Sequence, residues 1–330
     1  MLGLLDGSLS CDVDAADSED ADDGSLFDLA KIIPAELLAD ELEYLPSAFD
    51  SDLPDFCHPN DRSALAKMKS VPEFTKVMSV YAKHFSDRER HLEFMSNSLR
   101  VGPKQCPEIY APIPEICSFF GIDTPEVYVA NSSKVIAFAS GATQHQLVVT
   151  TGLLDTVEPK ELEATSVREC AHIFCKHMLY FSFGKALTSG ILNATLGNLP
   201  VIRGVSNLAT KALSSAYNLW SRCAELSADR AEALYYDDPD EVVMRFLRSA
   251  GGNSRYTKEL NISAFREQGE EYLNEVSGSG VSKFYHMFDM ADSAQRLYPI
   301  RTAELYHWIE SEDYANIKPK YNTERFKVVA

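Results

Sequence analysis

The chain has 330 residues, of which 45% are hydrophobic and 10% aromatic, which is enough to build one large core or two ordinary ones. Its formal net charge is -18. Because binding to phosphate backbones needs a basic face, nucleic acid is not an expected partner.

The N-terminal segment carries much of the negative charge. Nine acidic residues precede the first basic residue, Lys31. Such a run repels itself and favours a largely disordered, solvated tail, which we expect over residues 1–62, with one short helical patch at residues 34–45. From Ser63 onward apolar residues recur with helical spacing, so an organised domain is expected over residues 63–330.

Cellular location is addressed by the cysteines and by the N-terminus. The seven cysteines are scattered and form no C-x-x-C pair, which fits reduced thiols better than a disulfide framework. The acidic start lacks the basic region of a signal peptide, so a cytoplasmic protein is expected. No window reaches 18 uninterrupted apolar residues, and we expect no membrane span.

Short β-branched runs follow the first helical region. They occupy residues 126–130, 134–140 and 146–151, separated by turn-forming residues, and predict a small antiparallel sheet. Pro159 then sits where a helix can begin. Further helical patterns predict an α+β, mainly helical fold, and they cover residues 206–236, 240–249, 262–276 and 301–311.

Two motifs on predicted helices carry the chemistry. In "SVRECAHIF" Glu169 and His172 match the last part of the zinc-peptidase signature H-E-x-x-H, but Arg168 stands where the first histidine belongs. In "AELSADRA" Glu225 and Asp229 share one helix face, so that Glu225 can reach a metal while Asp229 orients a histidine ligand. Taken alone, the second motif is more often a solvated face.

Taken together and in this order, the motifs resemble the soluble HtpX-like zinc metallopeptidases, gluzincins related to the membrane CAAX prenyl proteases. The resemblance covers roughly Ser63 to Tyr321 and includes the segment "RLYPIRTAELYHW". It implies a zincin-like metallopeptidase domain with its small sheet beside the active-site helix. It also implies Zn²⁺ as cofactor and a peptide or protein as partner.

Position by position, the resemblance assigns roles. Glu169 matches the general base, His172 the second zinc histidine, Glu225 the carboxylate ligand, and Asp229 its orienting neighbour. Arg301 matches a retained C-terminal arginine, and Gln295 replaces an expected histidine. The strand that resembles the peptide-binding edge consists of Val135, Ile136, Ala137, Phe138, Ala139, Ser140 and Gly141.

Arg168 is the weightier departure from the family pattern. A guanidinium has no lone pair to offer, stays protonated and repels a dication, so His172 and Glu225 remain as two ligands where catalytic zinc normally has three. We expect Arg168 to form an ion pair with Glu225 or Glu169 at the place of the metal. The alternative interpretation has Arg168 turning out to solvent.

The missing ligand has one nearby candidate. Cys175 lies three residues after His172, but a buried structural cysteine is the favoured interpretation. His177 is expected to point away from His172 at the helix end. Two functions follow: a catalytically impaired pseudopeptidase that retains the fold and a peptide-binding groove, or an active zinc-dependent metalloendopeptidase with an atypical metal site.

Overall fold

The computed structural model describes residues 52–71, 74–84, 87–190, 207–236, 238–251, 256–277 and 297–327. The acidic tail up to residue 51, with its expected helical patch, lies outside the described residues, as does Gln295. The division of the chain at residue 62 stays a prediction, and it falls inside the first helix, α1 (Pro59–Lys69). Phe56, before α1, and Asp61, in its first turn, both precede this division and are fully buried.

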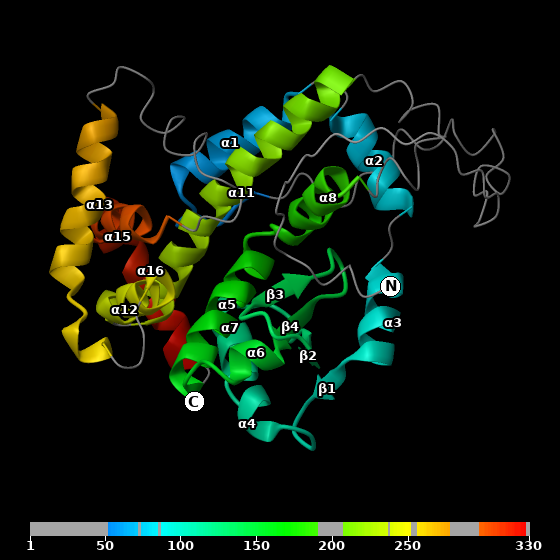
Figure 1. Ribbon diagram of the computed structural model, residues 1–330, viewed down its shortest axis with the longest axis horizontal. Helices are drawn as coiled ribbons and strands as arrows, with labels where there is room; N and C mark the ends of the chain where they lie inside the picture. The colour runs from blue at the N-terminus through cyan, green and yellow to red at the C-terminus, as the bar shows by residue number, and fades with distance from the viewer. Residues whose placement is uncertain are drawn as a thin grey trace, which may run out of the picture.

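The N-terminal helices are α1, α2 (Phe74–His84) and α3 (Asp87–Asn97). His58 caps α1, because its Nδ1 accepts the backbone N–H of Asn60 at 3.1 Å. α1 lies along the long helix α11 (Asn207–Tyr235), as Figure 1 shows. The first described helix therefore packs against the helix that carries Glu225.

A mixed four-stranded sheet follows, with strand order β1-β2-β4-β3. Its strands are β1 (Leu99–Val101), β2 (Glu126–Ala130), β3 (Ala137–Ser140) and β4 (Gln146–Thr150). The prediction of an antiparallel sheet is wrong for β2 and β4, which pair in parallel. The chain passes from β2 to the sheet edge as β3 and returns between them, so β4 runs in the direction of β2.

Both faces of the sheet are covered. Val127 and Leu147 point into the main core with α5 (Ile113–Phe120) and α7 (Pro159–Phe174). On the opposite face, residues of β2, β3 and β4 pack against Phe94 of α3. The carboxylate of Asp87, at the start of α3, accepts backbone N–H groups of the β3–β4 turn at 2.6 to 3.1 Å, which fixes that turn.

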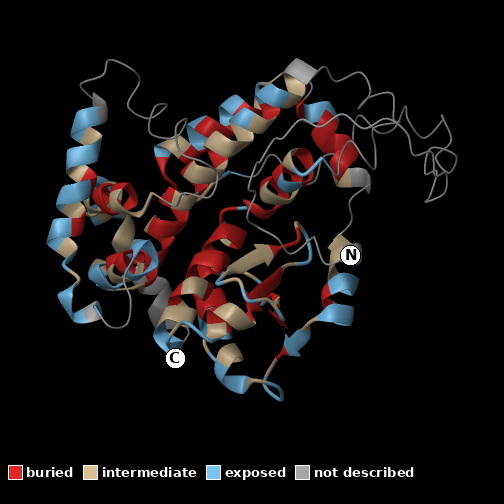
Figure 2. Ribbon diagram, viewed as in Figure 1, coloured by how far each residue is buried: buried red, intermediate tan, exposed pale blue. Residues whose placement is uncertain are grey.

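Helix α7 begins at Pro159, as predicted, and its C-terminal half is buried on all sides. Every residue from 166 to 173 is buried, including Arg168 and Glu169, and Figure 2 shows this part of the molecule in red. Charged side chains in such a helix must be paired, because unpaired charges are costly to bury. The helix ends at Phe174, and Lys176 adopts a left-handed φ of 60°.

The remaining helices agree with the predicted ones, apart from α8 (Met178–Thr188) and α16 (Glu312–Lys327), for which no helix was predicted. α11 matches the pattern at residues 206–236. The other helices confirmed are α12 (Pro239–Ala250), α13 (Ile262–Ser277) and α15 (Tyr298–Ile309). α8 crosses α11 closely, since a Cβ on Gly184 would overlap the ring of Tyr217. Short turns at α4 (Pro107–Tyr110), α6 (Thr151–Leu154) and η6 (Thr257–Glu259) complete the described elements.

Candidate active site

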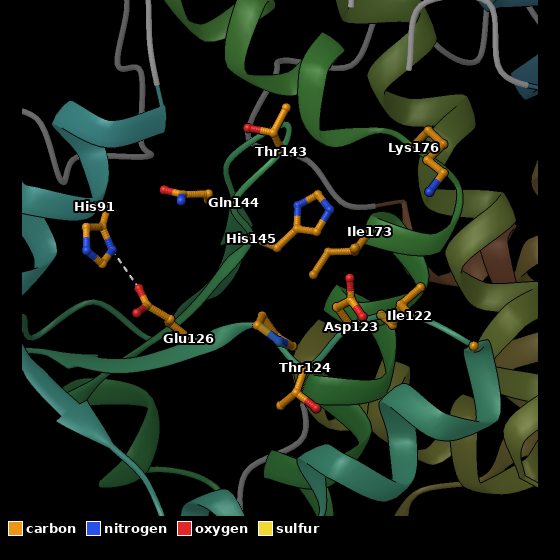
Figure 3. Close-up of a pocket in the computed structure, with 12 residues that line it drawn as sticks. His91, Ile122, Asp123, Thr124, Glu126, Thr143, Gln144, His145, Ile173 and Lys176 are labelled. Carbon is orange, nitrogen blue, oxygen red and sulfur yellow. Dashed lines mark ion pairs between the residues drawn. The ribbon is translucent and has the colours of Figure 1, made fainter. Parts of the chain in front are cut away.

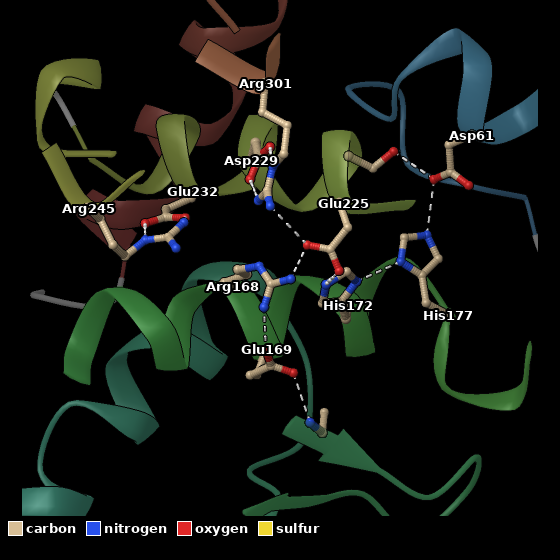
Figure 4. Close-up of polar contacts among 12 residues, drawn as sticks. Asp61, Arg168, Glu169, His172, His177, Glu225, Asp229, Glu232, Arg245 and Arg301 are labelled. Carbon is tan, nitrogen blue, oxygen red and sulfur yellow. Dashed lines mark hydrogen bonds and ion pairs between the residues drawn. The ribbon is translucent and has the colours of Figure 1, made fainter. Parts of the chain in front are cut away.

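Three helices bring the predicted site residues together. α7 contributes Arg168, Glu169 and His172, α11 contributes Glu225 and Asp229, and α15 contributes Arg301. Figure 4 shows these side chains converging between α7 and α11. All are buried except Glu225, whose side chain is 25% exposed. Arg168 and Arg301, which are far apart in the chain, both contact Glu225, as the resemblance implied for one site.

Arg168 forms ion pairs with two carboxylates. Its Nη1 donates to Glu169 Oε1 at 2.7 Å, and its Nη2 donates to Glu225 Oε2. The predicted ion pair is confirmed, and the alternative of a solvent-directed arginine is wrong. Burial by itself would lower the pKa of Arg168, but Glu225 and Glu169 outweigh it and raise that pKa above its usual value.

Arg301 approaches the same oxygen of Glu225 that Arg168 contacts. Its Nε donates to Asp229 Oδ2 at 2.7 Å, and its Nη1 lies 3.5 Å from Glu225 Oε2. Burial would raise the pKa of Glu225, yet Arg168 and Arg301 hold it well below its usual range. The expectation that Asp229 orients a histidine is wrong, because both of its oxygens accept from the guanidinium of Arg301 and position 168 offers no imidazole.

His172 is oriented by a second histidine. Its Nδ1 lies 2.9 Å from His177 Nδ1, and its Nε2 lies 3.7 Å from Glu225 Oε1. The expectation that His177 points away is wrong. The left-handed φ at Lys176 turns the chain, and the backbone N–H of His177 donates to the backbone carbonyl of His172. Burial lowers the pKa of His172 well below its usual value, which favours a neutral ring.

Asp61 of α1 completes this side of the site. Its carboxylate is fully buried and accepts from Trp220 Nε1 at 2.9 Å and from Ser227 Oγ at 2.6 Å. His177 Nε2 lies 3.1 Å from the same carboxylate. Burial would raise the pKa of Asp61, but these partners lower it. Sequence reasoning missed Asp61, because nothing near it in the chain marks an acid of α1 as buried beside α11.

Glu169 also contacts the sheet. Its second oxygen, Oε2, accepts the backbone N–H of Ala139 at 2.8 Å. Ala139 lies on β3, which is an edge strand of the sheet, as the prediction for residues 135–141 required. Within that predicted segment, β3 itself covers Ala137–Ser140, while Gly141 turns the chain with a φ of 85°.

The donor set does not fit a catalytic zinc ion. His172 Nε2 and Glu225 are the matched ligands, and the guanidinium of Arg168 occupies the third position without a lone pair to offer. Over the described ranges, no group of three or more His, Cys, Asp or Glu side chains is placed to hold a metal ion. The Sγ of Cys175 faces Cys57 Sγ at 3.4 Å in the core.

A separate cavity of about 450 Å³ lies between the loop from α5 to β2 and the β3–β4 turn (Figure 3). It is lined by residues including Asp123, His145 and Lys176, and His91 at its side contacts Glu126 at 2.6 Å. None of the residues of the candidate active site lines it. It therefore adds no group to the site.

An edge strand lies beside the helix with the Glu169–His172 pair, and a second helix supplies Glu225, which is the arrangement that the resemblance to zincin-like metallopeptidases implies. Residues 103–263 match the model of peptidase family M48. The family implies zinc as its metal and proteins as its substrates. No described helix has the length and apolar character needed to cross a bilayer.

Several curated proteins are similar over most of the chain. The plastoglobule-localized metallopeptidase 48 of Arabidopsis thaliana is 25% identical over 83% of this chain and 77% of its own length. A protease HtpX homolog of Ralstonia nicotianae is 27% identical over 73% of this chain and 87% of its own. One from Streptomyces coelicolor is 29% identical over 63% and 75% respectively. No solved structure matches the chain.

Proposed function

We propose that the chain is a pseudopeptidase, an M48 domain that keeps the peptidase fold and a peptide-binding edge strand but does not hold catalytic zinc. One observation carries the proposal. The guanidinium of Arg168 contacts both Glu225, which matches the carboxylate ligand, and Glu169, which matches the base that acts on metal-bound water. These contacts support a positive charge in place of the metal.

Charge supports this interpretation. Three carboxylates, those of Glu169, Glu225 and Asp229, face the two guanidinium groups of Arg168 and Arg301. A dication beside Arg168 would meet a fixed positive charge at a few ångströms in a weakly screened interior. The carboxylates are thus stabilised by arginine, which does not polarise a peptide carbonyl or activate water as zinc does.

The hydrogen bonds of Glu169 also support an inactive site. A general base needs an oxygen directed at the attacking water. Here Oε1 accepts from Arg168 and Oε2 accepts from the Ala139 amide. Glu169 therefore serves as a structural acceptor, and binding of a peptide or protein at the β3 edge is the activity that the remaining parts support.

The test is to measure the zinc content of the purified full chain together with its cleavage of denatured casein. We expect no stoichiometric zinc and no cleavage above that of Glu169→Gln. Stoichiometric zinc in a chain that cleaves casein, with cleavage lost in Glu169→Gln, would establish the alternative, an active metalloendopeptidase with an atypical site, and overturn the proposal.

A further inference from the structure

The outer edge of β3 presents backbone groups at alternate residues. The N–H of Thr150 donates to the carbonyl of Ile136 at 3.2 Å, and the next residue, Ala137, is opposite Val149. In an antiparallel pair, inward and outward groups alternate. Ala137 and Ala139 therefore direct their N–H and C=O groups away from β4, toward the side of β3 where no described strand pairs with it.

One of these outward groups is already taken. Glu169 Oε2 accepts the Ala139 N–H at 2.8 Å, in the place where the carbonyl of an added strand would lie (Figure 4). The other oxygen of the same carboxylate is held by Arg168 Nη1 at 2.7 Å. Glu169 is 4% exposed, so water does not readily replace either partner. Arg168 thus holds the Glu169 carboxylate against the backbone of β3.

We propose that Glu169 is an internal cap on the β3 edge and competes with an extended segment of a partner protein for the Ala139 amide. The inference rests on the proposed peptide-binding function. A partner strand can pair with both outward groups of Ala137, but its next carbonyl meets the Glu169 carboxylate, an acceptor against an acceptor. Complete strand addition requires Glu169 to withdraw.

Arg168 keeps the Glu169 carboxylate in its capping position. A carboxylate bound by a guanidinium is kept ionised and in place by a charge-assisted hydrogen bond, which is stronger than a neutral one. The residue that stands in the metal position therefore also restrains the residue that blocks the strand. The partner that fits best is an extended segment that pairs at Ala137 and stops, or one bound strongly enough to displace Glu169.

The test compares the full chain with Glu169→Ala and with the control Glu163→Ala. Glu163 lies on the same helix, but it contacts Tyr235 rather than the sheet. Amide hydrogen exchange at Ala139, followed by NMR, should be slow in the unchanged chain and in the control, and faster in Glu169→Ala. Reduced, carboxymethylated α-lactalbumin serves as the probe for extended segments.

We expect Glu169→Ala to bind the probe about three- to tenfold more tightly than the control does, the equivalent of one net hydrogen bond. The binding should protect the Ala139 amide. If Glu169→Ala binds the probe no more tightly than the control does, or if the Ala139 amide exchanges at the same rate in both without probe, the proposal that Glu169 caps β3 is wrong and the proposed peptide binding still stands. Failure of every variant to bind the probe overturns the proposed function instead. Should Glu169→Ala not fold, Glu169→Gln loses the ion pair at equal volume and should show a smaller gain.

Discussion

The two sides of the His172 ring differ in kind. On the Nδ1 side, His177 and Asp61 form a fully buried chain of hydrogen-bonding groups that fixes the ring. On the Nε2 side, Glu225 lies between two guanidinium groups. The first side resembles the outer-shell support that a metal-binding histidine has. The second has the chemistry of a buried ion-pair network, which supports the proposal that this site does not hold catalytic zinc.

This contrast predicts how each side responds to substitution. Buried ion pairs add little net stability compared with apolar packing, but removal of one partner leaves an uncompensated charge. A buried carboxylate held by several separate hydrogen-bond donors loses less, since each donor contributes one hydrogen bond. The ionic side should therefore be the more sensitive of the two.

The largest effect is expected for Arg168→Met. Glu169 would lose its guanidinium and Glu225 would keep only that of Arg301, and breaking a buried pair costs about 3–5 kcal/mol. Arg248→Met is the control. Arg248, on α12, pairs with Glu161 of α7, the helix that carries Arg168, but its side chain is 39% exposed, and surface pairs contribute about 0–1 kcal/mol. Urea unfolding measures both, and equal losses in the two variants would contradict the account.

A smaller effect is expected for Asp61→Asn. The amide group would face the donors of Trp220, Ser227 and His177, so we expect a loss of about 1–3 kcal/mol at neutral pH. Because the pKa of Asp61 is lowered on folding, its contribution is fully present above the unfolded value of about 3.9 and is lost as the pH falls below it.

The free energy of unfolding should therefore fall less steeply below about pH 4 in Asp61→Asn than in the unchanged chain. The exposed residue Asp123 offers the control substitution Asp123→Asn, which should leave the slope as it is. Identical slopes in the chain with and without Asp61 would show that this carboxylate is not the stabilised group. Urea titrations at a series of pH values measure the slopes.

The smallest effect concerns Cys175. Its thiol faces Cys57 in the core, and burial raises its pKa well above the usual value, so it is poorly suited to act as a thiolate ligand. In a chain that carries Arg168→His, the further change Cys175→Ser should alter zinc affinity by less than about twofold, because a ligand that is not used contributes nothing to coordination. A large loss of affinity, measured by calorimetry, would make Cys175 a ligand.

Local patterns predicted helix positions: Pro159 marked the start of α7, and apolar spacing predicted α11 nearly to the residue. The Arg168 ion pair followed from the family resemblance, which gathers Glu169 and Glu225 around the metal position that Arg168 enters. The parallel pairing of β2 and β4 was not predictable, since strand periodicity carries no information on strand order.

The support for His172 was missed for a different reason. His177 turns back because Lys176, which is not a glycine, adopts a left-handed φ, and no residue type nearby signals this. Asp61 meets His177 across 116 residues and Trp220 across 159. Contacts over such separations depend on the packing of α1 against α11, which a single sequence does not specify.

The most direct test of the central claim is a zinc titration of the unchanged chain and of Arg168→His, followed by calorimetry after metal removal. If the guanidinium occupies the metal position, the unchanged chain should show no saturable binding. Arg168→His should bind one zinc ion per chain through His172 and Glu225, and the added change His172→Ala should abolish that binding. Saturable binding of equal strength in the unchanged chain would contradict the claim.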